Sequence, residues 1–148
     1  MYKRQEEPLQ RFPVVRTSDT EEMKHALFTA YGATGFDVPD PDGFEGCGNY
    51  VQLEDIALGF CAYGAPTKVN FPEGDFVRQQ IGLSGHAATT IDGATTEIHA
   101  RQSCITSPER SATLQFGRNY KQLILRVDKT ALERKLSLIL GGDADRKN

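Results

Sequence analysis

Paired histidines are the residues of this sequence whose type and spacing come closest to a metal site. His86 and His99 lie at equal distances before and after the turn Asp92-Gly93, so we expect them to face each other across a hairpin. A metal ion needs several converging ligands, and Glu97 could join the pair only from the opposite face of its strand. The spacing therefore predicts a surface or packed histidine pair and no metal site.

Nucleophilic and phosphate-binding patterns are weak in this chain. Its three cysteines, Cys47, Cys61 and Cys104, are an odd number without CxxC spacing, which predicts neither a disulfide framework nor a zinc knuckle. Cys61 lies in an apolar segment typical of a buried thiol, and no G-x-S-x-G elbow occurs. The Gly-rich segment 43–49 precedes a strand rather than the helix that a phosphate-binding loop needs. We expect no catalytic residue and no cofactor.

A ligand pocket inside a β-barrel is the more open possibility. One alternating row of the segment 76–83 is mostly apolar, which predicts that this row points inward. The row consists of Val77, Gln79, Ile81 and Leu83. Gln79 would then be a polar group in apolar surroundings, with either a ligand or a neighbouring backbone group as its partner. The candidate ligand-binding residues are Gln79, the aromatic residues Tyr50, Phe60 and Tyr63, and the histidines His86 and His99.

The last apolar stripe lies in the segment 129–140, which is predicted to be a helix that begins at Asp128 and ends at Gly141-Gly142. The stripe consists of Leu132, Leu136, Ile139 and Leu140. Two interpretations stay open, because one and a half heptads are too short to separate them. The stripe covers a sheet of its own chain, or it packs against its copy in a dimer.

Composition describes the whole chain as one ordinary domain. It has 148 residues, 39% hydrophobic and 25% charged, with a formal net charge of −3. A nucleic-acid-binding protein usually has an excess of basic residues, so this chain is not expected to bind DNA by itself. No secretory signal and no membrane-spanning run occurs in the sequence. With reduced cysteines, the expected location is the cytoplasm and no membrane partner is expected.

Short strands separated by turns make up the body of the chain, from Phe44 to Val127. Glu54-Asp55, the segment 72–75 and Asp92-Gly93 are the clearest turns between them. This spacing is typical of an antiparallel sandwich or barrel. An opening helix begins with a capping box, Ser18 and Glu21, carries an apolar stripe and ends at Gly32. The segment from Gly35 to Pro41 is predicted to be a loop.

The order of these elements resembles a known family. Six short motifs follow one another: RTSD at 16–19, YGAP at 63–66, LSG at 83–85, Ser-Pro at 107–108, KQLILRV at 121–127 and ALERKL at 131–136. Together they resemble the N-terminal domain of AraC-type transcription regulators. The resemblance implies a mostly β fold, an antiparallel double-stranded β-helix (cupin jelly roll) with an N-terminal and a C-terminal α-helix. It also implies sensing of an unidentified small-molecule effector and formation of a homodimer.

The polar ends predict a disordered N-terminal tail at 1–11 and a linker or cut end at 143–148, and the resemblance implies a cupin-like domain at 12–142 between them. DNA would be bound only through a helix-turn-helix region absent from this sequence. Metal-dependent cupin enzymes carry His-x-His, whereas the segment after Gly85 is His86-Ala87-Ala88. Two alternatives stay open. One is a small metal-dependent dioxygenase or isomerase using His86 and His99, and the other is a structural domain whose barrel is filled by side chains.

Overall fold

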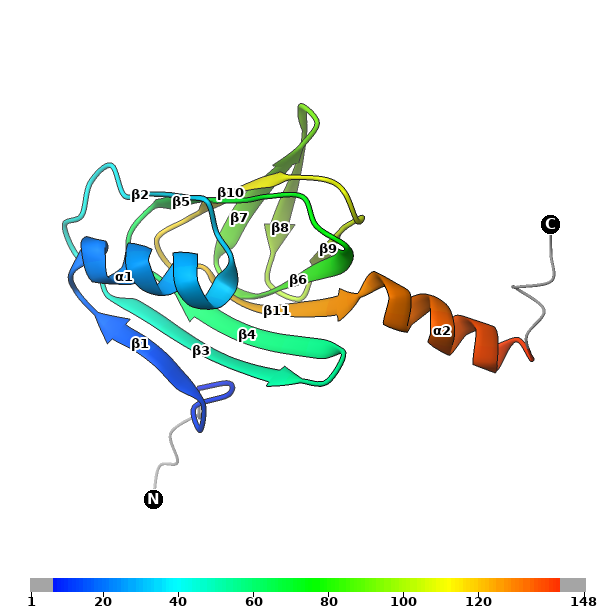
Figure 1. Ribbon diagram of the computed structural model, residues 1–148. Coiled ribbons are helices and arrows are strands. Elements are labelled where there is room, and N and C mark those ends of the chain that lie inside the picture. The colour runs from blue at the N-terminus through cyan, green and yellow to red at the C-terminus, as the bar shows by residue number, and fades with distance from the viewer. Residues whose placement is uncertain (1–6, 142–148) are drawn as a thin grey trace, which may run out of the picture.

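Two antiparallel sheets face each other and enclose the core in the computed structural model, which describes residues 7–141 (Figure 1). Residues 1–6 of the predicted tail, and Gly142 with the predicted linker at 143–148, lie outside the described residues. Residues 7–11 precede the first strand. There Asn49 Nδ2 donates to the Glu7 carboxylate at 2.7 Å and to the Pro8 carbonyl at 2.8 Å.

Eleven strands and three helical segments follow the chain. They are β1 (Pro13–Thr17), α1 (Thr20–Ala26), the π-helical η1 (Leu27–Tyr31), β2 (Gly35–Asp37), β3 (Gly46–Leu53), β4 (Ile56–Ala62), β5 (Thr67–Phe71), β6 (Phe76–Ser84), β7 (His86–Ile91), β8 (Ala94–His99), β9 (Ser103–Thr106), β10 (Ala112–Phe116), β11 (Lys121–Asp128) and α2 (Lys129–Ile139). The larger sheet has the order β1-β3-β4-β11-β6-β9 and the smaller one β2-β5-β10-β7-β8. The predicted antiparallel fold with a helix near each end is confirmed.

The predicted hairpins are confirmed, because their turn residues act locally. Glu54-Asp55 connects β3 to β4, and Asp92-Gly93 connects β7 to β8. Asp92 and Gly93 have φ values of 52° and 81°, the left-handed pair that a two-residue hairpin requires. The segment from Gly35 to Pro41 is not entirely a loop, since β2 takes its first three residues and pairs with β5.

Helix α1 begins one residue later than its sequence predicted. Asp19, and not Ser18, is the N-cap: its carboxylate accepts a hydrogen bond from the Glu21 backbone N–H at 3.0 Å. Asp and Ser are about equally good caps, so the choice between neighbours rests on the backbone conformation, which is extended at Asp19. Gly32 ends the helical segment with a φ of 75°, as predicted.

Tyr31 holds the helical segment against the larger sheet. Its hydroxyl donates toward the backbone carbonyls of Asn49 at 2.8 Å and Phe60 at 3.1 Å. A Cβ atom at Gly48 would lie 2.8 Å from the Tyr31 hydroxyl, and one at Gly59 would lie 3.1 Å from its ring. Two strands therefore carry glycine where the tyrosine comes closest.

The prediction of which face of β6 points inward was wrong. Arg78 and Gln80 are the buried residues, whereas Gln79 is half-buried and Leu83 is exposed on the opposite face. The outer face of the larger sheet is itself rich in Val, Ile and Leu. Its members include Val51, Leu53, Ile56, Leu58, Val77, Ile81, Leu123, Leu125 and Val127. An alternating apolar row therefore could not mark the interior of this sheet.

Helix α2 continues β11 and projects away from the two sheets (Figure 1). Asp128 caps it, as predicted, by accepting from the Ala131 backbone N–H at 3.0 Å. Within residues 7–141, no helix is long and apolar enough to cross a membrane.

Gly85 is the position where the chain leaves the larger sheet for the smaller one, and we expect Gly85→Ala to destabilise the protein strongly. Its φ is 71°, and an added Cβ would lie 2.6 Å from the Asn119 backbone. Gly93→Ala is the matched control, because its φ is 81° but nothing lies within 4 Å.

Chemical denaturation of both variants checks this expectation. Gly93→Ala should lose only the left-handed backbone cost, about 1–2 kcal/mol. Gly85→Ala should lose a further amount of about 1–3 kcal/mol, because backbone must move to make room. Equal losses for the two variants would contradict the close approach at Gly85.

Candidate ligand-binding site

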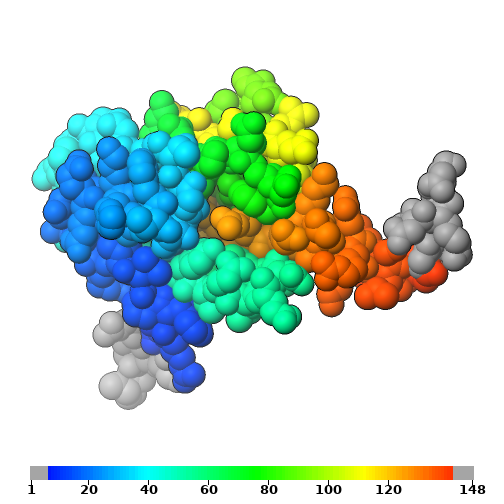
Figure 2. Space-filling view, in the orientation of Figure 1, coloured from blue at the N-terminus to red at the C-terminus, as the bar shows by residue number. Residues whose placement is uncertain are grey.

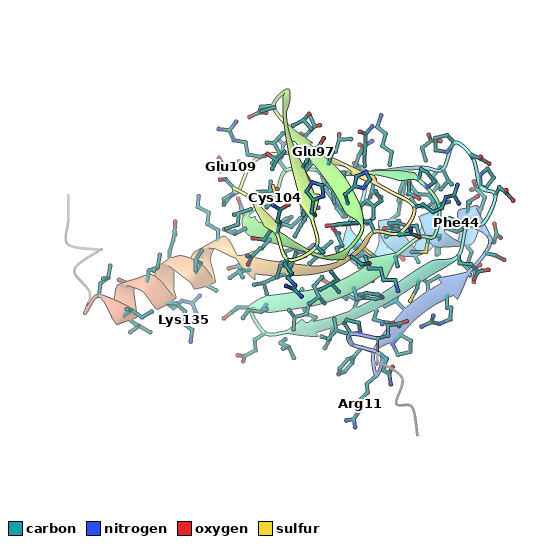
Figure 3. All side chains as sticks on the ribbon, turned by 180° about the vertical axis from the view of Figure 1, so that it is seen from behind. Arg11, Phe44, Glu97, Cys104, Glu109 and Lys135 are labelled. Atoms are coloured by element: carbon teal, nitrogen blue, oxygen red, sulfur yellow. The ribbon has the colours of Figure 1, made fainter. Side chains whose placement is uncertain are left out.

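Aromatic rings close one end of the barrel. Tyr63 is 1% exposed and lies 4.8 Å from the Phe116 ring and 5.9 Å from the Phe36 ring, measured between centroids. Phe44 is stacked on Tyr63 and lies at the end of the molecule away from α2 (Figure 3). This end is filled by side chains, so Tyr63 is a core residue there.

Hydrogen-bonded glutamines occupy the middle of the barrel. Gln80 and Gln122 are fully buried, and Gln80 Nε2 donates to Gln122 Oε1 at 3.1 Å. Thr89 from the smaller sheet donates to Gln80 Oε1 at 2.9 Å, and the Tyr120 hydroxyl donates to Gln122 Oε1 at 3.1 Å. Buried amides need such partners, so this network specifies how the two sheets face each other.

Cys61 lies beside this network and is an inert thiol. Gln122 Nε2 approaches its sulfur at 3.7 Å. Burial raises the pKa of the Cys61 thiol to about 11. Since the thiolate is the reactive form, Cys61 is protonated and unreactive near neutral pH. The sequence-based expectation of a buried thiol is consistent with this environment.

Two arginines line a cavity at the other end of the barrel. Arg78 on β6 and Arg126 on β11 are direct neighbours across the sheet. The cavity has a volume of about 20 Å³, room for roughly one or two water-sized groups. Its lining residues are Tyr31, Tyr50, Ala57, Gly59, Phe71, Arg78, Ile124 and Arg126. Figure 2 shows orange atoms of β11 at the bottom of a hollow between the helical segment, the green loop before β6 and the β3–β4 hairpin.

Arg78 is the unusual group in this cavity. It is only 3% exposed, and its Nη1 nitrogen is buried without a hydrogen-bond partner among the described residues. Its guanidinium lies 4.5 Å from the centre of the Phe71 ring and 5.1 Å from that of Phe76. Burial, with a smaller contribution from the nearby Arg126 charge, lowers the pKa of Arg78 to about 10. The group therefore still carries its positive charge at neutral pH.

Only one predicted ligand-binding residue lines this cavity. Tyr50 does, with its ring 5.2 Å from the Tyr31 ring. Phe60 is buried on the outer face of the larger sheet, beside the turn at Pro8. Gln79 lies on the same outer face, where its Nε2 donates a hydrogen bond to the Ser103 hydroxyl at 3.3 Å.

The predicted histidine pair exists but lies away from the cavity. His86 and His99 are register partners on β7 and β8, with ring centroids 6.0 Å apart, and both are exposed. Glu97 Oε1 is 3.9 Å from His99 Nε2, so the expectation that Glu97 lies on the opposite face of its strand was wrong: residues two apart in a strand point to the same side. In the described part of the chain, no three His, Cys, Asp or Glu side chains come together as a potential metal site.

Sequence reasoning missed Arg78 and Arg126. The signal that could have found them is their position: each is the one charged residue in a run of otherwise uncharged residues, FVRQQIGL for Arg78 and QLILRV for Arg126. Their pairing across β6 and β11 depends on the sheet order, which brings together strands far apart in the chain.

A family profile described as the AraC-binding-like domain matches residues 23–144. The chain belongs to this family. A search of curated proteins finds no match to the sequence. The family match agrees with the resemblance of the sequence motifs.

Solved structures share the fold of this AraC-binding-like domain at low identity. The AraC-like transcriptional activator CuxR matches with a TM-score of 0.56 and 15% identity, over 69% of this chain and 41% of that chain. The Schizosaccharomyces pombe Cnp3 cupin domain matches with a TM-score of 0.50 and 14% identity, over 62% and 66%. A predicted oxalate decarboxylase from Thermotoga maritima matches with a TM-score of 0.50 and 13% identity, over 79% and 92%. The chain thus spans less than two thirds of the CuxR and Cnp3 chains, and its fold is cupin-like.

Adjacent residues of β6 offer a direct test of the inward face. We expect Gln80→Leu to lower the free energy of unfolding by about 2–4 kcal/mol, because it leaves the Thr89 hydroxyl without its acceptor and removes a donor from Gln122. Gln79→Leu is the control on the outer face and should change stability by less than about 0.5 kcal/mol. Denaturant unfolding measures both, and a larger loss for Gln79→Leu would reverse our assignment of the faces.

Proposed function

We propose that this chain is the effector-sensing and dimerisation domain of an AraC-type transcription regulator. It would bind a small molecule in the barrel and act on DNA through a separate helix-turn-helix region. The observation that carries the proposal is the cavity beside Arg78, where a buried guanidinium nitrogen has no hydrogen-bond partner among the described residues, in a chain of the AraC-binding-like family. Burying such a donor without a hydrogen bond costs free energy, which a bound ligand would recover.

The apolar stripe of α2 supports the dimerisation part of the proposal. Leu132 is half-buried, whereas Leu136, Ile139 and Leu140 are 47%, 76% and 52% exposed. The stripe therefore does not cover a sheet of its own chain, which was one of its two interpretations. A copy of the same helix would bury it.

The mouth of the cavity lies beside the start of α2, which suggests how effector and dimer would communicate. Arg126 precedes Asp128, the N-cap of α2, by two residues. The backbone N–H groups of Asp128 and Lys129 donate to the carbonyls of Asp55 at 3.1 Å and Asp75 at 3.0 Å. An effector that binds one arrangement of these loops better would shift the population of α2 orientations. Equal affinity for both arrangements would regulate nothing.

A thermal-unfolding screen of the 148-residue chain tests the sensing part. Sugars, small aromatic acids and fatty acids form the panel. A true effector at a hundredfold its Kd should stabilise the folded state by about 2.7 kcal/mol, in a saturable manner. An effector that stabilises the chain but leaves its oligomeric state and that of the full regulator unchanged would contradict the coupling to α2.

Two substitutions on α2 test the dimer. We expect the chain to be a dimer in solution and the double variant Leu136→Glu, Ile139→Glu to be a monomer, because charge replaces apolar area buried in each copy. The dimer Kd should rise at least about a hundredfold. Lys135→Glu, an exposed neighbour that projects from the same helix, is the matched control (Figure 3). Size-exclusion chromatography with light scattering reads the mass, and a wild-type monomer at high concentration would refute the proposal.

A further inference from the structure

We infer that the cavity at Arg78 and Arg126 is a binding site for a small organic carboxylate. The inference rests on the proposed sensing function and names the chemical class of its effector. The carboxylate would lie against the two guanidinium groups, and its apolar body would lie among the aromatic side chains of the mouth.

Positive charge without an anionic partner among residues 7–141 is the first argument. Arg78 Nη1 is buried with no hydrogen-bond partner in that range, and Arg126 lies directly beside Arg78 in the sheet. Among residues 7–141, no carboxylate forms an ion pair or hydrogen bond with either arginine. Thr106, opposite Arg78 on β9, also has a buried hydroxyl with no hydrogen-bond partner in the described part of the chain. A buried charge is stable only when it is paired, so these groups are complementary to an anion that the chain itself does not supply.

The geometry of the arginines favours a planar anion. A guanidinium offers parallel N–H donors that match the two oxygens of a carboxylate. Phe76 lies against both arginines, 4.4 Å from the Arg126 guanidinium and 5.1 Å from that of Arg78, and so holds their planes in place. The free space of about 20 Å³ is room for one or two water-sized groups, so only the charged end of such a ligand would enter the cavity.

Apolar walls argue that the ligand has an organic body. Ala57, Gly59, Phe71 and Ile124 line the cavity together with the rings of Tyr31 and Tyr50. The polar anchor is therefore at one end of a mostly apolar site, an arrangement typical of small-molecule pockets. Tyr50 and Arg126 are only half-buried, so the site is open to solvent on the side where the body would enter.

Binding of defined probes tests the inference. Sodium benzoate, hexanoate and acetate are titrated at constant ionic strength against the 148-residue chain, with benzamide as the neutral counterpart of benzoate. Thermal unfolding and calorimetry provide the readouts. We expect at least one carboxylate to raise the unfolding midpoint in a saturable manner, benzamide to have no effect, and Arg78→Met to weaken carboxylate binding at least about tenfold.

Two variants keep the test interpretable. Arg78→Met removes a buried unpaired charge, so its unfolding midpoint without ligand should be no lower than that of the wild type. Arg11→Met, at an exposed arginine of the N-terminal turn, is the control and should bind like the wild type (Figure 3). Inorganic phosphate and chloride reveal whether any response is a general effect of anions.

The outcomes separate this inference from the proposed function. No saturable response to any of the three carboxylates, an equal response to chloride, or full binding in Arg78→Met would overturn the carboxylate site. A neutral sugar that binds wild type and Arg78→Met alike would overturn it while leaving the sensing function intact. A wild-type chain that is monomeric would count against the dimerisation function and leave the carboxylate site standing.

Discussion

The hydrogen bond from Thr89 to Gln80 joins the two sheets at the centre of the barrel, and the bond from Gln80 to Gln122 holds the Gln80 amide in place within the larger sheet. Each of these groups is nearly or fully buried, so each must keep its partner or lose the free energy of a desolvated amide or hydroxyl. Apolar contacts alone tolerate sliding, whereas this network accepts one alignment of the sheets. The aromatic end and the arginine end of the barrel both depend on that alignment.

The side chains that fill the barrel therefore change in type along its axis. Aromatic rings around Tyr63 fill one end, the glutamines hold the middle, and Arg78 with Arg126 lines the other end. Packing stabilises the first two regions without a ligand. The third has a buried guanidinium whose Nη1 has no hydrogen-bond partner in the described chain, which costs stability in the free protein. A ligand that pairs with the Arg78 guanidinium would offset this cost.

Position in the fold also links the arginine end to α2. The strand that carries Arg126 continues directly into the helix, and the first residues of that helix bond to the two loops beside the cavity. The aromatic end is at the far side of the molecule (Figure 3). The arginine end of the barrel is therefore the end that is joined to α2, the helix with the exposed apolar stripe.

Local features of this protein follow from its residues alone. Asp92-Gly93 forms its hairpin because both residues accept left-handed backbone, and counting from that turn places His86 opposite His99. The motif order also indicated the family, since it depends on the succession of elements and not on their contacts. Only the tertiary structure decided which face of β6 lies inside. The more apolar row of that strand, with Gln79, lies on an outer face that is itself rich in Val, Ile and Leu, whereas the mostly polar row with Arg78 is the buried one. The pairing of Arg78 with Arg126 likewise required the sheet order, because a hydrophobic pattern describes burial along one strand and contains no information about which distant strand lies beside it.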